Sequence, residues 1–226
     1  VDEVIVVFPF EKSFYKKHGI DVLYMGNPIL DQIEKSNFSF TYNSRKQIIA
    51  LLPGSRKQEI NAILPIMISL VDNFKNYQFV IAATNTFSKN FYNSFIGKKN
   101  VDIVFNQTYG LLKQSHAALV TSGTASLEAA LLNVPQVVCY KTNILTYIVA
   151  SNLINIKFLS LVNILMNRLI VKELIQYDLH VKNLTLSLSE ILDIDNRKNI
   201  HINYDLLKEK IGKEGCSKQL AEYITK

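Results

Sequence analysis

Short runs of β-branched and aromatic residues alternate with segments of helix length over roughly the first 140 residues of the chain. Because helix-length segments separate most of these runs, successive strands are expected to lie parallel, with helices over both faces of the sheet. The sequence therefore predicts an α/β fold whose ligands bind beyond the carboxyl ends of the strands. The expected strands span residues 4–8, 22–25, 47–52, 78–83, 101–105, 117–120 and 136–140.

Three segments follow from this pattern. Residues 1–36 supply a strand and a helix that lead into the sheet, residues 37–169 form the sheet domain, and residues 170–226 form a helical tail. No strand pattern is visible after Ile170, and breaks near Asp195 and Gly215 predict three helices in the tail. The chain begins at Val1, almost directly in a strand pattern, so we interpret it as a fragment whose N-terminal part is missing.

Composition narrows the function only slightly. The formal charge of +6, from 25 Lys and Arg against 19 Asp and Glu, is spread along the chain. It indicates no nucleic-acid partner and fits anionic small molecules or an anionic membrane surface equally well. Cys139 and Cys216 have neither metal-ligand nor disulfide spacing, which favours the cytoplasm. In the apolar region 144–171, Lys157 and Arg168 leave no uncharged stretch long enough to span a membrane.

The first loop with a chemical signature is LLPGSRKQEI, residues 51–60. Ser55 and Gln58 fit a capping box for the following helix, in which Pro65 predicts a kink or a late start. The same register places Arg56 at the helix N-terminus, where the dipole disfavours a cation. A bound anion would reverse this effect, because arginine offers two donors to a phosphate. The loop alone leaves phosphate binding and simple capping open.

The second loop lies in TSGTASLEAALLNVPQVVCY, residues 121–140. Gly123 allows close approach of the backbone to a ligand, and Thr124 is a candidate cap for a helix that begins near Ala125. Glu128 cannot belong to a capping box, because the residue three positions earlier is alanine. A carboxylate in this place could accept hydrogen bonds from a ribose. The alternative is a solvated glutamate stabilised by the helix dipole.

The third stretch is FLSLVNILMNRLIVKELIQ, residues 158–176. Asn163 lies among apolar residues, so its amide needs partners, and a structural amide that holds a loop is the alternative to a ligand contact. Glu173 follows Arg168 and Lys172, where an exposed, salt-bridged helix face is the ordinary explanation. No metal site and no cofactor are expected, because the histidines are scattered without ligand spacing. They are His18, His116, His180 and His201.

Four stretches together, residues 9–31, 51–60, 122–141 and 160–176, resemble the lipid-A-disaccharide synthase family of bacterial GT-B glycosyltransferases. The resemblance runs in unbroken order over about the first 180 residues. It implies two Rossmann-like domains that face each other across a cleft, of which this chain matches the C-terminal one. It also implies inverting transfer of 2,3-diacylglucosamine from UDP to 2,3-diacylglucosamine 1-phosphate, which gives lipid A disaccharide 1-phosphate and UDP.

The resemblance also implies roles for single residues. Arg56 would contact the UDP phosphates, Glu128 would hold the ribose, and Asn163 would help to complete the site. The general base is expected in the missing N-terminal half, so we expect this chain to bind UDP weakly without turnover. Relatives often carry Gly-His-Pro where Asn27 stands here, so a proton-transfer role of that histidine is not carried over. The implied UDP-sugar site comprises Gly54, Ser55, Arg56, Ser122, Gly123, Thr124, Glu128, Asn163 and Glu173.

Partners follow from the same resemblance. Because both implied substrates are acylated, a cytoplasmic protein with peripheral contact to the inner membrane is expected, and the apolar residues 144–156 fit that contact. The helical tail resembles helices that exchange between subunits, so a swapped homodimer is a further expectation. The alternatives are another UDP-sugar GT-B enzyme, an enzyme similar to UDP-N-acetylglucosamine 2-epimerase, or a non-catalytic nucleotide-sugar-binding module.

Overall fold

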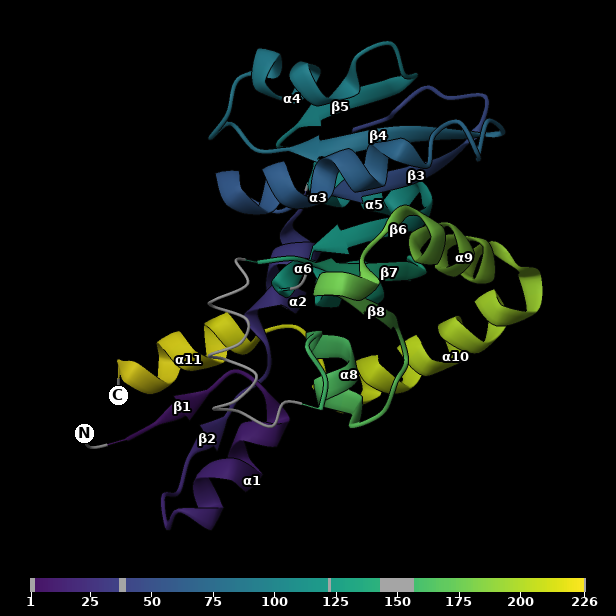
Figure 1. Cartoon of the computed structure of the whole chain (residues 1–226). Coiled ribbons are helices and arrows are strands. Elements are labelled where there is room, and N and C mark those ends of the chain that lie inside the picture. Colours follow the sequence, from purple (N-terminus) through teal and green to yellow (C-terminus); the bar gives the residue numbers. More distant parts are fainter. Residues whose placement is uncertain (1–2, 37–39, 122, 143–156, 226) are drawn as a thin grey trace.

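The structure, a computed structural model, describes residues 3–36, 40–121, 123–142 and 157–225. Six parallel strands form one sheet in the order β5-β4-β3-β6-β7-β8 (Figure 1). The predicted parallel α/β fold is therefore confirmed. The strands are β3 (Gln47–Leu52), β4 (Tyr77–Ala83), β5 (Val101–Phe105), β6 (Ser115–Thr121), β7 (Gln136–Tyr140) and β8 (Lys172–Ile175).

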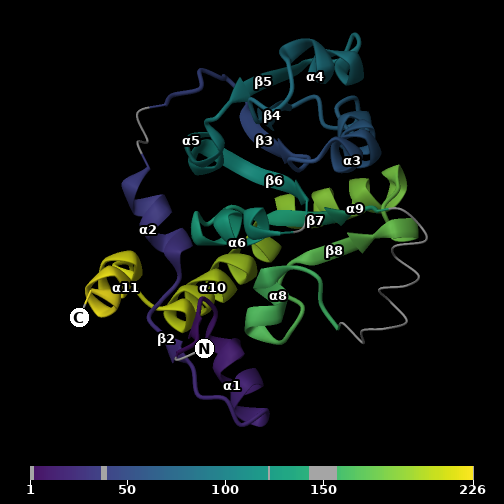
Figure 2. The ribbon, with the colours of Figure 1, turned by 90° about the vertical axis from the view of Figure 1, so that its left-hand side faces the viewer.

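Helices cover both faces of this sheet (Figure 2). One face packs against α3 (Lys57–Ser69), α4 (Lys89–Ile96) and α9 (Val181–Leu192). The other packs against α5 (Thr108–Gln114) and α6 (Thr124–Leu131), and also α8 (Leu161–Met166) and α10 (Ile194–Ile211). In β3, Leu51 belongs to the first core and its neighbour Leu52 to the second. Because side chains alternate along a strand, a strand covered on both faces is apolar throughout.

The order of the strands reverses at β3. The chain passes from β3 to β4 and β5 on one side, then crosses back to β6 on the other side and continues to β7 and β8. The strands β3 and β6 are direct neighbours, with Leu52 beside Val120 near their carboxyl ends. Their following helices, α3 and α6, leave toward opposite faces. A sheet with this reversal has its crevice at the carboxyl ends of these two strands.

The tail differs from expectation in one respect. The absence of a strand after Ile170 was a wrong prediction, because β8 pairs with β7 through Val138 and Glu173. With four residues at the sheet edge and two charged side chains, β8 is too short and too polar to show a strand pattern. The three expected tail helices are confirmed as α9, α10 and α11 (Cys216–Ile224). The late start of α3 is not observed, because that helix begins at Lys57 and continues through Pro65.

A small N-terminal unit precedes the sheet. It contains the parallel pair β1 (Ile5–Val6) and β2 (Leu23–Tyr24), with α1 (Pro9–Lys17) between them, and it leads into α2 (Pro28–Lys35). Asn27 links this unit to α2: its side chain accepts a hydrogen bond from Ile29 N at 2.9 Å and donates one to Val7 O at 2.9 Å. Asn27 therefore caps α2.

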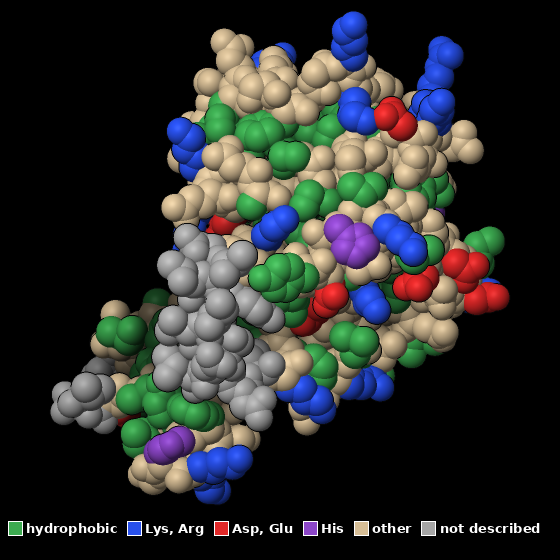
Figure 3. Space-filling view, in the orientation of Figure 1, with side chains coloured by type: hydrophobic (Ala, Val, Ile, Leu, Met, Phe, Trp, Pro, Cys, Tyr) green, Lys and Arg blue, Asp and Glu red, His purple; other side chains and the backbone are tan. Residues whose placement is uncertain are grey.

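The surface shows no single basic patch on the face in Figure 3, where Lys and Arg side chains are scattered. This distribution agrees with the spread of positive charge along the sequence and gives a polyanion no continuous surface on that face. Within the described ranges, no helix has the length and apolar character needed to cross a bilayer.

One buried carboxylate joins the C-terminal helix to α2. Asp31 is only 4% exposed and accepts hydrogen bonds from the backbone N–H groups of Gly215 and Ser217, the latter at 2.7 Å. It therefore caps α11 from another helix. Burial would raise the pKa of Asp31, but hydrogen bonds from Ser217, Gly215 and Cys216 lower it to about 2. Because folding favours the ionised form, the stability that Asp31 contributes to the folded protein is complete above about pH 4 and is lost as the pH falls toward about 2.

Replacing Asp31 should release α11. We expect Asp31→Asn to lower the free energy of unfolding by about 1 kcal/mol, since one charged acceptor of two N–H groups is lost. Hydrogen exchange should accelerate in α11 more than in the sheet. The exposed Asp21→Asn is the matched control and should leave both unchanged. Equal protection of α11 in both variants would contradict the capping role.

Candidate functional site

A cavity of about 390 Å³ lies at the carboxyl ends of β3 and β6, where the strand order reverses. Two glycine-containing loops, one after each strand, form its walls. The sequence predicted both loops separately, and the structure places them around one space. The lining residues are Leu52, Gly54, Ser55, Arg56, Glu59, Ala82, Thr84, Thr108, Thr121, Gly123, Thr124, Ala125 and Glu128.

The loop after β3 requires glycine. Gly54 has a φ of +96°, and a Cβ atom there would lie 2.5 Å from Oε2 of Glu59. The predicted capping box is wrong, because Arg56 occupies the N-cap position of α3 and Ser55 precedes the cap. Arg56 Nη1 instead contacts Glu59 Oε1 at 2.9 Å, with 82% of the arginine side chain exposed. Glu59 thus supplies the negative charge beside Arg56 that we had expected from a bound anion, and it holds the guanidinium at the rim of the cavity.

The loop after β6 brings backbone donors to the same space. Gly123 has a φ of +137° and is the N-cap of α6, so Thr124 is the first helical residue and its predicted capping role is wrong. The first N–H groups of a helix have no acceptor within it, and Thr124 and Ala125 line the cavity. These groups carry partial positive charge that attracts an anion. Ser122, also predicted for this site, lies outside the described residues.

Two threonine hydroxyls in the cavity lack partners. The Oγ1 atoms of Thr84 and Thr121 are buried without a hydrogen bond in the described part of the protein. Both residues line the cavity, and Thr121 is only 4% exposed. A buried hydroxyl without a partner destabilises a protein by roughly 1–3 kcal/mol. A polar ligand in the cavity would supply the missing partners.

Glu128 separates this cavity from a second one. The neighbouring cavity, of about 540 Å³, is bounded mainly by residues 106–110, which join β5 to α5 and form the start of α5, and Glu128 and Thr108 line both cavities. Burial raises the pKa of the Glu128 carboxyl, and a hydrogen bond from Tyr109 opposes that rise. Tyr109 Oη lies 3.1 Å from Glu128 Oε1. The glutamate is therefore half-buried rather than solvated, and sequence reasoning missed its tyrosine partner because nothing near Tyr109 forms a motif.

Asn163 and Glu173 do not line this cavity. Asn163 is fully buried, and its amide donates to Val171 O and Glu173 Oε1 while accepting from the N–H groups of Ile170 and Val171. The expected helix face for Glu173 is wrong, because this residue lies on β8. Its carboxylate also accepts two backbone N–H groups and the Ser160 hydroxyl at 2.7–2.9 Å. The geometry favours the structural alternative, in which both side chains hold the residues on either side of α8.

Chemically, the 390 Å³ cavity suits an anion joined to a polyhydroxyl group. Backbone N–H groups, two free hydroxyls and Arg56 can bind phosphate oxygens, while Glu128 can accept hydrogen bonds from hydroxyl groups. No group of three or more His, Cys, Asp or Glu that could hold a metal ion occurs among residues 3–36, 40–121, 123–142 and 157–225.

Solved structures with the same architecture define the class. A putative UDP-N-acetylglucosamine 2-epimerase from Listeria monocytogenes has a TM-score of 0.66 at 12% identity, covering 99% of this chain and 59% of its own. A UDP co-structure of S. aureus MnaA also has a TM-score of 0.66, at 14% identity and 99% and 60% coverage. The spinosyn rhamnosyltransferase SpnG has a TM-score of 0.56 at 14% identity, with 85% and 49% coverage. The fold is thus of the GT-B type, which sugar transferases and epimerases share, so fold alone does not select a reaction.

Sequence comparison makes the assignment narrower. The profile of the lipid-A-disaccharide synthetase family matches residues 1–224, and the chain belongs to this family. A lipid-A-disaccharide synthase from Syntrophus aciditrophicus is 33% identical, covering 98% of this chain and 61% of the relative. Lipid-A-disaccharide synthase 1 from Legionella pneumophila strain Lens is 34% identical, covering 90% of this chain and 56% of the relative. The chain thus spans about three fifths of the length of these relatives.

The role of Asn163 can be tested by separating stability from binding. We expect Asn163→Ala to lower the free energy of unfolding by about 3 kcal/mol or more, because four buried or part-buried groups lose their hydrogen bonds. UDP affinity of the folded variant should stay within about twofold of wild type, a small difference in binding free energy. Urea unfolding and calorimetric titration measure the two quantities, with the exposed Asn90→Ala as control. Full stability combined with lost UDP binding would instead favour the ligand contact that the resemblance implied.

Proposed function

We propose that the cavity at β3 and β6 binds the diphosphate and ribose of a UDP-sugar. The observation that carries this proposal is the meeting of two glycine loops, two helix N-termini and Glu128 around one space. Membership of the lipid-A-disaccharide synthetase family supports it, as does the likeness in fold to a protein whose structure is described as a UDP complex.

In this proposal the loop after β6 binds phosphate oxygens through the N–H groups of α6 and the Thr121 hydroxyl. Arg56 turns from Glu59 to the diphosphate, because the diphosphate carries the greater negative charge and its oxygens can accept two hydrogen bonds from the guanidinium. Glu128 accepts hydrogen bonds from the ribose hydroxyls at the border of the two cavities. Ser122 belongs to the proposed site by sequence only, and Asn163 and Glu173 act on it indirectly by bracing the segment after β7.

The proposed reaction is transfer of 2,3-diacylglucosamine from UDP to 2,3-diacylglucosamine 1-phosphate. The acceptor hydroxyl forms a bond to the anomeric carbon as the bond to UDP breaks, so negative charge develops on the diphosphate. Positive groups and N–H donors around it stabilise that charge. This chain supplies the UDP-sugar site in the proposal. Because it spans 61% and 56% of the two relatives, we propose that transfer, including the general base, needs the rest of a full-length protein.

Two expectations about partners remain proposals. Peripheral contact with the inner membrane follows from the acylated substrates, and residues 144–156, which would take part, lie outside the described residues.

One feature of the structure supports exchange of the tail in a swapped homodimer. Leu207 and Ile211 are buried within the chain, whereas Ile202 is 59% and Leu206 43% exposed.

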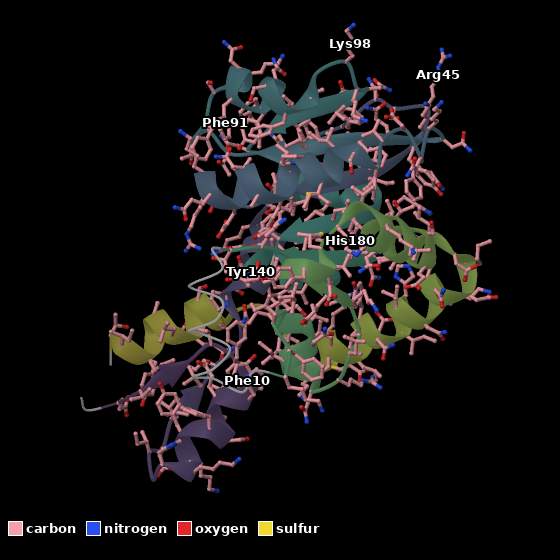
Figure 4. All side chains as sticks on the ribbon, viewed as in Figure 1. Phe10, Arg45, Phe91, Lys98, Tyr140 and His180 are labelled. Carbon is pink, nitrogen blue, oxygen red and sulfur yellow. The ribbon has the colours of Figure 1, made fainter. Side chains whose placement is uncertain are left out.

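Calorimetric titration with UDP in the absence of metal tests the proposed site. Saturable binding is expected, weakened about tenfold in Arg56→Ala, since one charge-assisted hydrogen bond to an exposed side chain is lost. Arg45→Ala is the matched control, because Arg45 lies near the amino ends of the strands, away from the cavity. Tyr140 marks the opposite, carboxyl ends of the strands in Figure 4. No binding by the folded wild-type chain, or equal loss in both variants, would contradict the site.

The unpartnered hydroxyl of Thr121 gives a second test. Thr121→Val removes a buried hydroxyl without a bond, so its thermal stability should equal or exceed that of wild type. UDP affinity should nevertheless fall, by about threefold to tenfold for one neutral hydrogen bond. Thr185→Val, at another buried hydroxyl without a partner but outside the cavity lining, should change stability similarly and leave affinity unchanged. Unchanged affinity in Thr121→Val would exclude its hydroxyl from the phosphate site.

A further inference from the structure

Tyr109 touches the site from α5 although it has no place in the sequence motifs. It is the second residue of that helix, and its hydroxyl lies 3.1 Å from Glu128 Oε1 on α6. On its other side the same hydroxyl lies 3.4 Å from Oε1 of Gln32 on α2. Three helices, α2, α5 and α6, therefore meet at one phenol.

The phenol has a single proton and two candidate acceptors. A carboxylate is a stronger acceptor than a side-chain amide, and its distance is the shorter one, so the proton belongs in the bond to Glu128. Burial raises the pKa of Tyr109, and the neighbouring Glu128 charge raises it further. The tyrosine thus remains a proton donor at neutral pH.

This bond occupies one oxygen of Glu128 and leaves the other available. Oε2 has no hydrogen bond from the described residues, and Glu128 lines both cavities. The titratable or charged side chains that line these cavities with it are Tyr109 from α5, together with Arg56 and Glu59 beside α3. Without the phenol, the glutamate side chain would be free to rotate, because it would lose the hydrogen bond that Tyr109 donates.

We infer that Tyr109 is a positioning residue, which fixes Oε1 of Glu128 so that Oε2 points a carboxylate lone pair at a hydroxyl of the bound nucleotide. This inference rests on the proposed binding of UDP. It adds a residue on α5 to the two loops that form the phosphate site.

The experiment compares UDP with its 2′,3′-dideoxy analogue, titrated into wild type and Tyr109→Phe. For UDP at neutral pH, the variant should bind about threefold to tenfold more weakly, and for the dideoxy analogue the two proteins should bind equally. The hydrogen bond from Tyr109 also lowers the pKa of Glu128 against the effect of burial. Its loss should therefore shift the acidic decline of UDP binding to higher pH.

Two controls separate positioning from general damage. Tyr42→Phe removes the hydroxyl of another tyrosine–carboxylate pair, with Asp102, away from the two cavities, and it should leave UDP binding and its pH profile unchanged. In a Glu128→Gln background, Tyr109→Phe should have a much smaller effect than in wild type, since the two residues act together.

The outcomes are distinct. If wild type binds UDP and Tyr109→Phe has the same affinity and pH profile, the positioning role is overturned while the proposed function stands. An equal loss for UDP and the dideoxy analogue would also overturn it, because Tyr109 would then act away from the ribose hydroxyls. If wild type binds neither nucleotide, the proposed function fails and the inference fails with it.

Discussion

Two helix N-termini face one cavity, and this concentration of partial positive charge is the constraint that shapes the rest of the site. Each N-terminus carries roughly half an elementary charge, and α3 and α6 begin at the carboxyl ends of adjacent strands. Arg56 adds a full positive charge at the rim. Within the chain, the Glu59 carboxylate partly compensates this positive charge. This carboxylate lies against position 54, where only glycine fits, because a Cβ atom there would be 2.5 Å from Oε2 of Glu59.

The residues of the cavity make unfavourable contributions to folding stability and provide polar groups for a ligand. Two buried hydroxyls are left without partners, and the Glu128 carboxyl is held where burial disfavours its charge. Away from the cavity, Asn163 uses both its donors and its acceptor, and the Asp31 carboxylate accepts two backbone N–H groups, whereas Gln136 Oε1 and Thr185 Oγ1 lack partners among the described residues. Unpaired polar groups in the lining of a preformed cavity are typical of a ligand site.

Most of the fold could be predicted because both faces of the central sheet are buried, so β3 and β7 appear as largely apolar runs with the bounds observed. The loops after β3 and β6 could be located for the same reason. Details that depend on contacts between distant residues were missed. The strand β8 gains its pairing only from β7, and Tyr109 reaches Glu128 from a different helix. No local pattern encodes such contacts, so sequence spacing alone could not supply them.

The central strand pair also has a consequence for how the protein folds. In the register of β3 and β6, Ile48 lies beside Ser115, and the whole of β4, β5 and their helices falls between these residues in the sequence. Closing so long a loop is entropically unfavourable, and contacts of this range form late and slowly. The pocket therefore has no counterpart in any shorter, locally folded intermediate. It comes into existence only in the step that joins the two halves of the sheet, so a nucleotide that binds it would act as a selective stabiliser of the fully assembled domain.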